Sequence, residues 1–351
     1  MAKTNWEEIV DHYGALIDGK LKELFAETKN AVKAYHPFIE EVYSNIEDFV
    51  LRKGKRLAAC STLLTYKGYA GDVDNRILKV GVGIELYRHC ILVHDDLVDE
   101  DVFRRGGKTF HKLFVENYDG RLGCGVAVFV GDLMYGMALQ SMLNSGFSKE
   151  KLSRVTLLLL DGYRSVNESQ ILDLLFEYKE PDVDEWYVMA SKRAASLFKT
   201  TILVGAILGN ASERDLQVLE EAGTRMGYSF DIQDDIIDTF ASLEQYGRPP
   251  CGDIVLGKKP LHVIYALKLA SREEIDKLKS LTSKKRMSPR DLESIREIVR
   301  ESGALEAAKE KSREHAEKAK ALIAQTSLSD EAKRFFSSLI TYIQESLDWY
   351  K

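Results

Sequence analysis

Two short acidic runs carry the side chains best suited to chemistry in this sequence. They read Asp95-Asp96-Leu97-Val98-Asp99 and Asp234-Asp235-Ile236-Ile237-Asp238, with carboxylates at positions i, i+1 and i+4. In an α-helix the first and last carboxylates of each run share one face, about one turn apart, where like charges repel. No Lys or Arg lies three or four positions from any of these aspartates. The balancing charge must therefore come from outside the helix.

A hard divalent cation suits this set of oxygen ligands. Mg²⁺ in particular is usually held by one or two carboxylates together with phosphate oxygens of a substrate. The residues beside the runs are apolar, with Ile91 and Leu92 before the first and Phe230 and Ile232 before the second. The sequence therefore predicts two acidic helices, bordered by hydrocarbon side chains, that face each other across a Mg²⁺ site.

Cationic residues gather near both runs. They occur in Gly54-Lys55-Arg56, Arg104-Arg105, Lys192-Arg193 and Gly257-Lys258-Lys259. Any one of these pairs alone is an ordinary surface feature. Carboxylates that gather metal ions, with Arg and Lys behind them, are typical of a diphosphate site, where metals bridge acid to phosphate and guanidinium groups bind the outer oxygens. The apolar neighbours of the acids indicate that the rest of the substrate is hydrocarbon.

The elements that position these residues are predicted to be helices. Apolar residues recur at the helical period through almost the whole chain, and strand-like alternation is scarce. Breaks at Gly, Pro and Asn divide the chain into roughly ten to thirteen helices. One of them is expected to start at Pro181-Asp182, with Glu185 in its first turn, and to run buried as far as Gly209. No repeat or shift in composition divides the sequence, so we expect a single all-α domain over residues 1–351.

Composition excludes several classes of protein. The chain has 351 residues, 45% of them hydrophobic, which is enough for a sizeable core, and only six prolines, which favours long helices. A net charge of −6 argues against a nucleic-acid partner. We found no signal-peptide core and no run of 18 apolar residues, so no transmembrane segment is expected. Four widely separated cysteines indicate reduced thiols and a cytoplasmic protein: Cys60, Cys90, Cys124 and Cys251.

Taken in order along the chain, these motifs resemble the trans-isoprenyl diphosphate synthases, also called polyprenyl synthetases. The acidic runs resemble the paired DDxxD motifs of that family, Gly54-Lys55-Arg56 its GKR motif, and the segment from Arg104 to His111 its RRGxxTxH run. Further matches are Gly131-Asp132, Gln170 with Asp173, Phe230, and Gly257-Lys258. The resemblance extends from about Gly54 to Lys259. One DDxxD is weak evidence, but two with GKR before and GK after are highly specific.

The resemblance implies a fold and a reaction. The family is all-α, with helices around a deep central cavity, usually a homodimer, and dependent on Mg²⁺. It implies a prenyltransferase of isoprenoid biosynthesis, in which an allylic diphosphate ionises and the double bond of isopentenyl diphosphate attacks the carbocation. Positioning and electrostatics supply most of such catalysis. The released diphosphate is the family's usual proton acceptor, and a cavity that excludes water protects the cation.

The resemblance also implies roles for individual residues. The direct metal ligands would be Asp95, Asp99 and Asp234. Support through water or hydrogen bonds would come from Asp96, Asp235 and Asp238. The allylic diphosphate would be held by Arg104, Arg193 and Lys258, with Lys192 and Gln170 also in the substrate site. Isopentenyl diphosphate would be held by Lys55, Arg56 and Arg105, with Gly54 shaping the loop.

Several positions depart from the family pattern. Where the family places a histidine ligand for isopentenyl diphosphate, this chain has Arg88, and His89 follows one step later. Arg88 is expected to bind phosphate without depending on pH. Asp231 replaces a glutamine one turn before Asp234, and it either adds to the metal site or pairs with a nearby lysine. His94 either hydrogen-bonds a metal-linked carboxylate or is structural.

Product length depends on the residues that precede the first acidic run. In this family a bulky side chain there closes the pocket for the growing chain. Cys90, five positions before Asp95, is small, and Ile91 follows it. Tyr87 lies one turn further back on the same face. If Tyr87 forms the floor of this pocket, the expected product is geranylgeranyl diphosphate, and the second choice is geranylfarnesyl diphosphate or a longer product. The alternative is that Tyr87 is an ordinary core aromatic.

Two other classes of protein compete with this interpretation. A class I terpene cyclase shares one DDxxD, but its second metal motif usually has Asn or Asp, then Ser or Thr, then Glu, and it has no use for GKR. A non-catalytic scaffold or regulatory paralogue commonly loses an acidic run or the arginines, all of which are present in this chain. We therefore predict a trans-prenyltransferase that uses isopentenyl diphosphate and an allylic diphosphate.

Overall fold

The helical period of the sequence is realised in seventeen helices within residues 5–246, 250–282, 284 and 287–345, which the computed structural model describes. The predicted all-α class is confirmed. The chain divides into two units. Unit 1 comprises Met1–Leu158, Thr201–Leu216 and Ser327–Phe335, and unit 2 comprises Leu159–Thr200, Gln217–Thr326 and Phe336–Lys351. This division does not test the single domain expected over residues 1–351, which stays a prediction.

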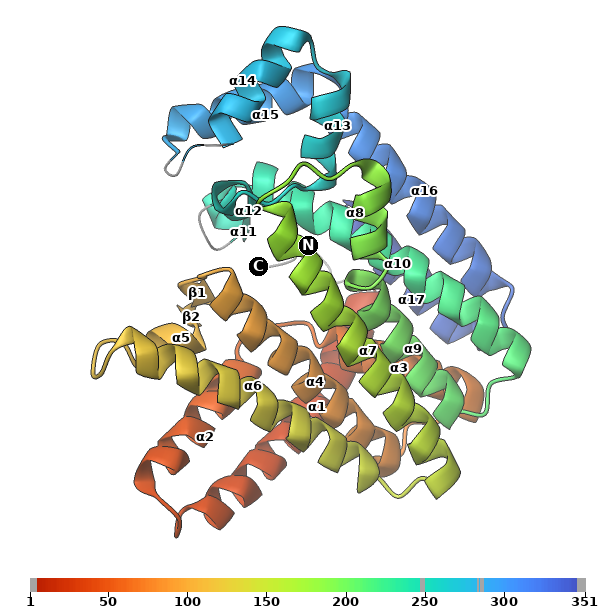
Figure 1. Ribbon diagram of the computed structural model, residues 1–351. Helices are drawn as coiled ribbons and strands as arrows, with labels where there is room; N and C mark the ends of the chain where they lie inside the picture. Colours follow the sequence, from red (N-terminus) through yellow and green to blue (C-terminus); the bar gives the residue numbers. More distant parts are fainter. Residues whose placement is uncertain (1–4, 247–249, 283, 285–286, 346–351) are drawn as a thin grey trace. The chain divides into compact units, whose positions relative to one another are not determined.

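Unit 1 holds the N-terminal helices and a short β-hairpin (Figure 1). Its complete elements are α1 (Asn5–Val32), α2 (Pro37–Leu51), α3 (Leu57–Ala70), α4 (Asn75–Val98), β1 (Phe103–Arg104), β2 (Gly107–Lys108), α5 (Phe110–Leu113) and α6 (Gly120–Leu143). Four further helices have residues in both units: α7 (Lys149–Phe176), α9 (Ala194–Leu208), α10 (Glu213–Phe240) and α17 (Asp330–Glu345).

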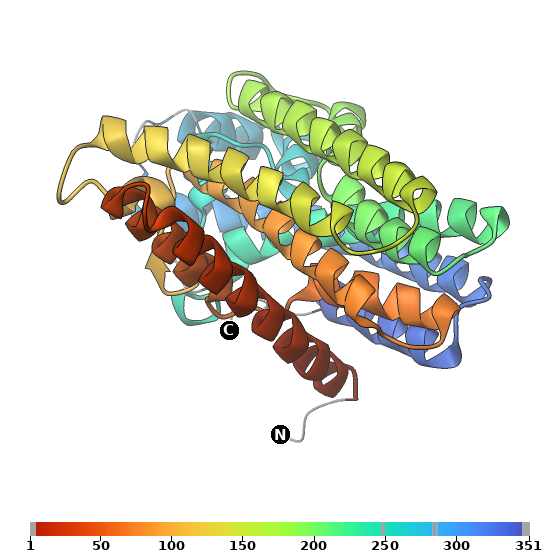
Figure 2. The same ribbon diagram turned by 90° about the horizontal axis from the view of Figure 1, so that it is seen from below.

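The core of unit 1 forms around α4. This helix packs along α6, as Figure 2 shows, and also contacts α1, α2, α3 and α5. Its buried side chains point in every direction, including those of Ile84, Leu86, Tyr87 and Cys90. A helix that is apolar all round is a core helix. The first acidic run therefore stands at the end of the most enclosed helix of this unit.

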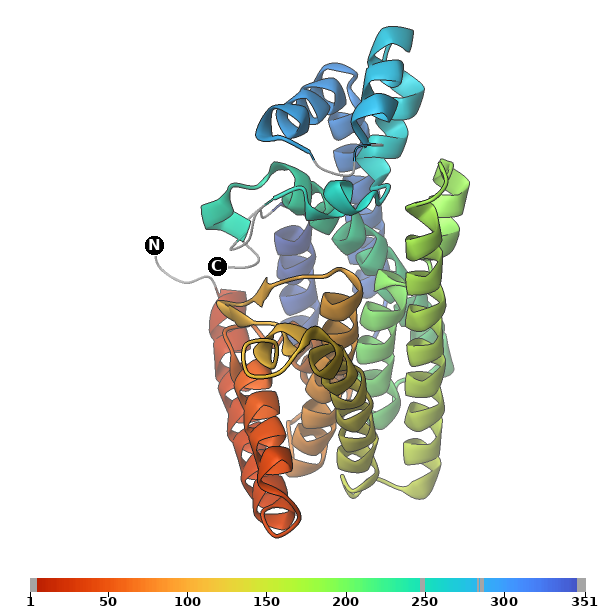
Figure 3. The same ribbon diagram turned by 60° about the vertical axis from the view of Figure 1, so that its left-hand side comes forward.

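Unit 2 holds the C-terminal helices. Its complete elements are α8 (Val183–Ala190), α11 (Leu243–Tyr246), α12 (Gly252–Leu256), α13 (Leu261–Leu269), α14 (Arg272–Thr282), α15 (Pro289–Glu301) and α16 (Ala304–Ala324). Helix α13 contacts α8, α14, α15 and α16, and α14 and α15 lie side by side (Figure 3). Fully buried Trp186 of α8 belongs to the core that these helices share.

The helix expected from Pro181-Asp182 to Gly209 is two helices. Its start is confirmed, because Asp182 caps α8 and forms a reciprocal capping box with Glu185. The prediction of one continuous helix is wrong: α8 ends at Ala190, and α9 begins at Ala194 after a three-residue turn. This split, together with three helices of only four or five residues, raises the number of helices above the ten to thirteen expected.

Helix α6 has the length and composition of a membrane-spanning helix, and it is the one such helix found in the described part of the chain. Only 33% of its most apolar window is buried. Core helices of proteins without membrane spans pass the same test, and α6 packs along α4 on one side. The expectation of no transmembrane segment therefore stays a prediction.

Candidate active site

The first acidic run lies at the C-terminal end of α4. Asp95 and Asp96 belong to the last turn, and Asp99 is the C-cap, whose backbone N–H donates to the Asp95 carbonyl at 2.8 Å. Carboxylates at this end of a helix oppose its dipole, and the last turn of α4 contains no basic residue. The run therefore needs cations from other elements, as its sequence indicated.

Arg104 of β1 supplies positive charge to this run. Its Nε donates to Asp96 Oδ1, and its Nη2 lies 3.4 Å from Asp101 Oδ2 and 3.9 Å from Asp95 Oδ2. Asp96 is fully buried, and burial raises its pKa to about 7 although Arg104 opposes the shift. The other oxygen of Asp96, Oδ2, makes no hydrogen bond with a described residue. Asp95, by contrast, keeps 27% of its side chain exposed.

The two arginines after the first run lie on a tight β-hairpin. Phe103 pairs with Lys108 and Arg104 with Gly107, so Arg105 and Gly106 form the turn. Both turn residues have positive φ, 51° and 80°, as the mirror-image turns of two-residue hairpins require. An arginine in this conformation costs roughly 1–2 kcal/mol, a strain that marks functional sites more often than others.

Arg105 directs its guanidinium back toward the start of α3. A Cβ on Gly54 would come within 2.7 Å of Arg105 Nη1, so a side chain at position 54 would push the guanidinium aside. Nη1 also lies 3.2 Å from Nε2 of His89 on α4. Burial lowers the pKa of Arg105 to about 10, Glu85 opposes this shift, and the nearby arginines, Arg88 among them, add to it. Arg105 remains a cation at neutral pH.

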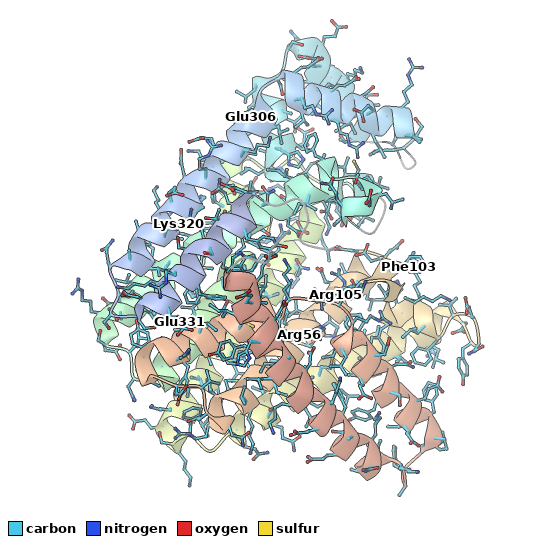
Figure 4. All side chains as sticks on the ribbon, turned by 180° about the vertical axis from the view of Figure 1, so that it is seen from behind. Arg56, Phe103, Arg105, Glu306, Lys320 and Glu331 are labelled. Atoms are coloured by element: carbon cyan, nitrogen blue, oxygen red, sulfur yellow. The ribbon has the colours of Figure 1, made fainter. Side chains whose placement is uncertain are left out.

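The remaining cations of the GKR region differ in exposure. Arg56 is buried and has positive φ; its Nε donates to Asp18 Oδ1 at 2.7 Å, and its Nη1 lies 3.7 Å from Glu85 Oε2. Lys55 is half-buried, 3.6 Å from Glu7 Oε1. Figure 4 labels Arg56 and Arg105. The structure thus engages Arg56 with two acids, and its role as a substrate ligand stays a prediction.

The second acidic run lies in the last two turns of α10, which also lack a basic residue in the final turn. Asp234 is half-buried, whereas Asp235 and Asp238 are buried. The two oxygens of Asp238 accept hydrogen bonds from the backbone N–H groups of Gly252 (3.2 Å) and Asp253 (3.3 Å) at the start of α12. Asp238 therefore holds the next short helix in place.

Arg193, in the turn between α8 and α9, pairs with three acids of unit 2. Its guanidinium lies 2.9 Å from Asp231, 3.2 Å from Asp173 and 3.9 Å from Asp235. Burial lowers the pKa of Arg193, but these carboxylates raise it well above its usual value. Burial raises the pKa of Asp231 to about 6 and that of Asp235 well above normal, although Arg193 lowers both. Asp231 thus pairs with an arginine rather than a lysine.

The other predicted cations of unit 2 divide into two kinds. Lys258 Nζ lies 3.3 Å from Asp173 Oδ2 and 3.3 Å from Asp253 Oδ1, and its side chain is 10% exposed. It therefore joins the network of Arg193 through their shared acid. Lys192 instead pairs with Glu168 near the surface. Gln170 is half-buried on α7, one turn before Asp173.

The residues expected to set product length lie inside unit 1. Tyr87 is fully buried, and its ring is 6.3 Å from that of Tyr135 on α6. Cys90 Sγ lies 3.0 Å from the Tyr87 carbonyl, and Ile91 is buried beside it. Tyr87 and Tyr135 together form an aromatic pair about two turns before the first acidic run, which fits both readings of Tyr87.

His94 serves the packing of α6 on α4. Its Nε2 lies 3.1 Å from the carbonyl oxygen of Val128, and a Cβ on Gly131 would come within 2.0 Å of the same nitrogen. The structural alternative for His94 is therefore supported. It also explains why a glycine occupies position 131, since any side chain would displace the imidazole ring.

The acidic residues fit Mg²⁺ by the chemistry of their donors. No group of three or more His, Cys, Asp or Glu side chains among the described residues forms a complete metal site. Mg²⁺ does not need one, because one or two carboxylates suffice when phosphate oxygens and water complete the shell. Asp95 and Asp234 are the half-buried first acids of their runs, and the adjacent Asp96 and Asp235 each keep one oxygen without a hydrogen bond to a described residue.

Sequence reasoning missed residues that hold the candidate side chains of each unit in place. Asp18 on α1 pairs with Arg56, and Asp253 pairs with Lys258. Arg52, at the end of α2, donates hydrogen bonds to the carbonyl oxygens of the hairpin. None belongs to a recognisable motif, and the sequence distance between Asp18 and Arg56 hides their contact. The one sequence signal for Arg52 was its position, two residues before the GKR motif.

Comparisons with known proteins agree on one family. The family model described as polyprenyl synthetase matches residues 39–299. The short chain isoprenyl diphosphate synthase of Methanocaldococcus jannaschii is 28% identical over 80% of this chain and 83% of its own length. The geranylfarnesyl diphosphate synthase of Aeropyrum pernix is 30% identical over 83% and 90%. The crystal structure of a geranylgeranyl pyrophosphate synthetase from Pyrococcus horikoshii has a TM-score of 0.83 at 26% identity, covering 98% of this chain and all of that one.

Proposed function

Because this chain belongs to the polyprenyl synthetase family, we propose that it joins an allylic diphosphate to isopentenyl diphosphate, head to tail and in trans geometry. It is a transferase that builds prenyl chains, in agreement with the activity named for its relatives. The observation that carries the proposal is the combination of two acidic runs, each at a helix C-terminus without its own cation, with an arginine from another element near each run: Arg104 on Asp96, and Arg193 3.9 Å from Asp235.

We assign the acidic runs to magnesium. Asp95, Asp99 and Asp234 are the direct ligands, and the buried acids support them: Asp96, Asp235 and Asp238. Bound Mg²⁺ would stabilise the negative charge that develops on the departing diphosphate. Asp238 keeps α12 and the following Lys258 in place through its two backbone hydrogen bonds. Arg104 orients Asp96 and neutralises part of its charge, and Arg193, 3.9 Å from Asp235, offsets part of the charge of the second run.

We assign the cations to the two diphosphates. Arg104, Arg193 and Lys258 bind the allylic diphosphate, with Lys192, Gln170 and Asp231 lining that part of the site. Isopentenyl diphosphate is bound at the residues around the hairpin: Gly54, Lys55, Arg56, Arg88 and Arg105. Four of these are cations, and burial first, then the neighbouring positive charges, lower the pKa values of Arg105 and His89. Such a cluster attracts a dianion.

Tyr87 is the residue we assign to the limit on chain length. It is fully buried on α4 with Tyr135 beside it, and Cys90 and Ile91 lie between it and the acidic run, Cys90 with a small side chain. A floor at this depth favours geranylgeranyl diphosphate, with a longer product such as geranylfarnesyl diphosphate second. Relatives with both product names occur in the comparison.

We also propose a cytoplasmic homodimer. The outward face of α6 presents Val128, Phe129 and Leu133 to solvent, and Phe129 is 67% exposed. Contiguous apolar surface of this kind marks an interaction site. The most apolar window of α6 is only one-third buried in a single chain. A second copy of the chain that covers α6 would bury the rest of it, so no membrane is needed to explain its apolar surface.

One assay tests the reaction. The protein is incubated with Mg²⁺, labelled isopentenyl diphosphate and each allylic primer in turn, and the products are separated by chain length. We expect incorporation with at least one primer, a product longer than farnesyl diphosphate, and loss of activity when EDTA removes the metal. No incorporation with any primer would favour a non-catalytic scaffold. A cyclic hydrocarbon formed without isopentenyl diphosphate would favour a terpene cyclase.

A further inference from the structure

His89 has both ring nitrogens engaged inside unit 1. The residue lies on α4 and is 1% exposed. Its Nδ1 lies 2.7 Å from the Glu85 carbonyl oxygen, one turn earlier in the helix, and its Nε2 lies 3.2 Å from Arg105 Nη1. A side chain held in this way does not present a nitrogen to solvent or to a substrate.

The chemistry of the two partners fixes the proton on the ring. A guanidinium group only donates hydrogen bonds, so Nε2 must accept one from Arg105. A carbonyl oxygen only accepts, so Nδ1 must carry the proton and donate it to Glu85. His89 is therefore a neutral imidazole protonated at Nδ1. Burial and the neighbouring cations, Arg105 first, lower its pKa well below the usual value, in agreement with this assignment.

The ring and the guanidinium are each confined by a second contact. The ring of Phe49 on α2 meets His89 edge to face, with 6.0 Å between the ring centres. On its other side, the Arg105 guanidinium lies against Gly54, where a Cβ would be 2.7 Å from Nη1. Arg105 is thus held between the GKR loop and the imidazole. These two contacts fix the orientation of the guanidinium and of its remaining N–H groups.

The Arg105 guanidinium needs these contacts because neighbouring positive charges repel it. Burial is the first cause that lowers the pKa of Arg105; Glu85 raises it, and the cations Arg56, Arg104 and Arg88 lower it further. Repulsion among arginines favours rotation of a long side chain toward solvent. A neutral acceptor at Nε2 opposes that rotation without neutralising the charge that a diphosphate needs.

We propose that His89 is a positioning residue for isopentenyl diphosphate, which holds the Arg105 guanidinium in its binding orientation through the acceptor nitrogen Nε2. The proposal rests on the proposed function and adds to it that His89 acts through Arg105 and does not touch the substrate. It also explains how the chain binds this diphosphate although its histidine lies one position after the place where the family's ligand histidine is expected.

Four variants of the whole chain test the proposal: His89→Phe, His89→Gln, Arg105→Ala and the double variant of His89→Phe with Arg105→Ala. His89→Phe keeps a ring but removes the acceptor, and His89→Gln offers an amide oxygen as acceptor. We expect His89→Phe to raise KM for isopentenyl diphosphate about tenfold or more, the effect of losing one hydrogen bond to a charged group. KM for the allylic primer and kcat should change less than about threefold, and His89→Gln should restore most of the affinity. In an Arg105→Ala background, His89→Phe should have no further effect.

The outcomes separate this proposal from the one on which it rests. Equal changes in both KM values, or an unchanged KM for isopentenyl diphosphate in an active His89→Phe enzyme, would overturn the positioning role alone. A further loss from His89→Phe in the Arg105→Ala background would show direct contact with the substrate and overturn it too. If the wild-type protein incorporates no isopentenyl diphosphate, both the proposed function and the positioning role of His89 are overturned. Nitrogen NMR provides a second readout, with a proton at Nδ1 expected and one at Nε2 contradicting the geometry.

Discussion

The guanidinium of Arg52 occupies the space that a side chain at Gly107 would fill. A Cβ on Gly107 would come within 2.2 Å of Arg52 Cζ. From this position Arg52 donates a hydrogen bond to the Lys108 carbonyl at 2.8 Å, while its Nε and Nη2 bind Asp48 at 3.0 and 2.7 Å. The end of α2 thereby holds the hairpin that carries both Arg104 and Arg105.

Gly107→Ala should release this hold. The guanidinium is the flexible partner, so it would move aside and lose its bond to Lys108 rather than distort the backbone. We expect kcat/KM to fall about tenfold, the effect of one lost hydrogen bond from a charged group, with both substrates affected because the hairpin carries both arginines. Gly19→Ala, on α1 with nothing within 4 Å of the added Cβ, is the matched control and should leave kinetics unchanged. Wild-type kinetics for Gly107→Ala would show that the contact of Arg52 with the hairpin does not position the two arginines.

Tyr87→Ala should lengthen the product. The substitution removes the ring that packs on Tyr135 and opens space two turns before Asp95. We expect chromatography to show products at least one five-carbon unit longer, at the cost of about 3 kcal/mol of stability for a buried aromatic truncated to alanine. Tyr87→Phe keeps the bulk and should keep the wild-type product. An unchanged product from an active Tyr87→Ala enzyme would mean that Tyr87 is only a core aromatic.

Local features of this chain were predictable from sequence because they depend on neighbours within one helical turn. The spacing of the acids indicated their repulsion and their need for outside charge, and Asp182 with Glu185 indicated the start of α8. The turn at Ser191–Arg193 was not predictable in this way. Its residues are compatible with a helix, and Arg193 is held there by acids of α7 and α10, far away in the sequence.

The same limit applies to the hairpin. Gly106-Gly107 indicates a break in the sequence, but two residues in each strand are too few to show alternation. The hairpin depends on Arg52 and on Thr109, whose hydroxyl donates to the Asp101 carbonyl at 2.6 Å. Charged residues near the motifs could be named as candidates from sequence, whereas the pairing of His89 with Arg105, which decides what each does, required the fold.

Arg193→Met should destabilise unit 2 strongly. It leaves Asp173, Asp231 and Asp235 without the cation they share, and loss of one partner from a buried network costs roughly 3–5 kcal/mol. The lower end is expected, because 21% of the Arg193 side chain is exposed. Lys192→Met, one residue away with its pair at the surface, should cost under about 1 kcal/mol. Urea unfolding measures both.

A second substitution separates charge from packing in this network. Adding Asp231→Asn to Arg193→Met removes one uncompensated buried charge, so it should return part of the lost stability without restoring activity. If the double variant is less stable than Arg193→Met, the three carboxylates are not held together by Arg193 in the way that the distances indicate.

Acid should weaken the protein through His315. This histidine lies between the Tyr187 hydroxyl at 3.1 Å and Arg225 Nη1 at 3.4 Å, and burial, with Arg225, lowers its pKa to about 4. Between pH 6.5 and 4 the unfolded chain binds the proton and the folded protein does not, so stability is lost as pH falls through this window, by about 3 kcal/mol in full. Comparing urea unfolding of wild type and His315→Gln at pH 7 and pH 4.5 isolates this group. The difference in free energy of unfolding between wild type and His315→Gln should fall by roughly 2 kcal/mol or more from pH 7 to pH 4.5. An equal difference at both pH values would exclude the effect.

Phe129→Glu should separate the proposed dimer into monomers. Two-fold symmetry would bring an interface residue of α6 and its copy into one patch, so each dimer would bury two added charges in an apolar surface. Tyr35→Glu changes an aromatic that is 78% exposed outside the regular helices and should leave the assembly intact. Light scattering after size-exclusion chromatography gives the mass of each variant directly. A wild-type mass near one chain of 39.7 kDa, or a dimer that survives Phe129→Glu, would place the second copy elsewhere than on α6.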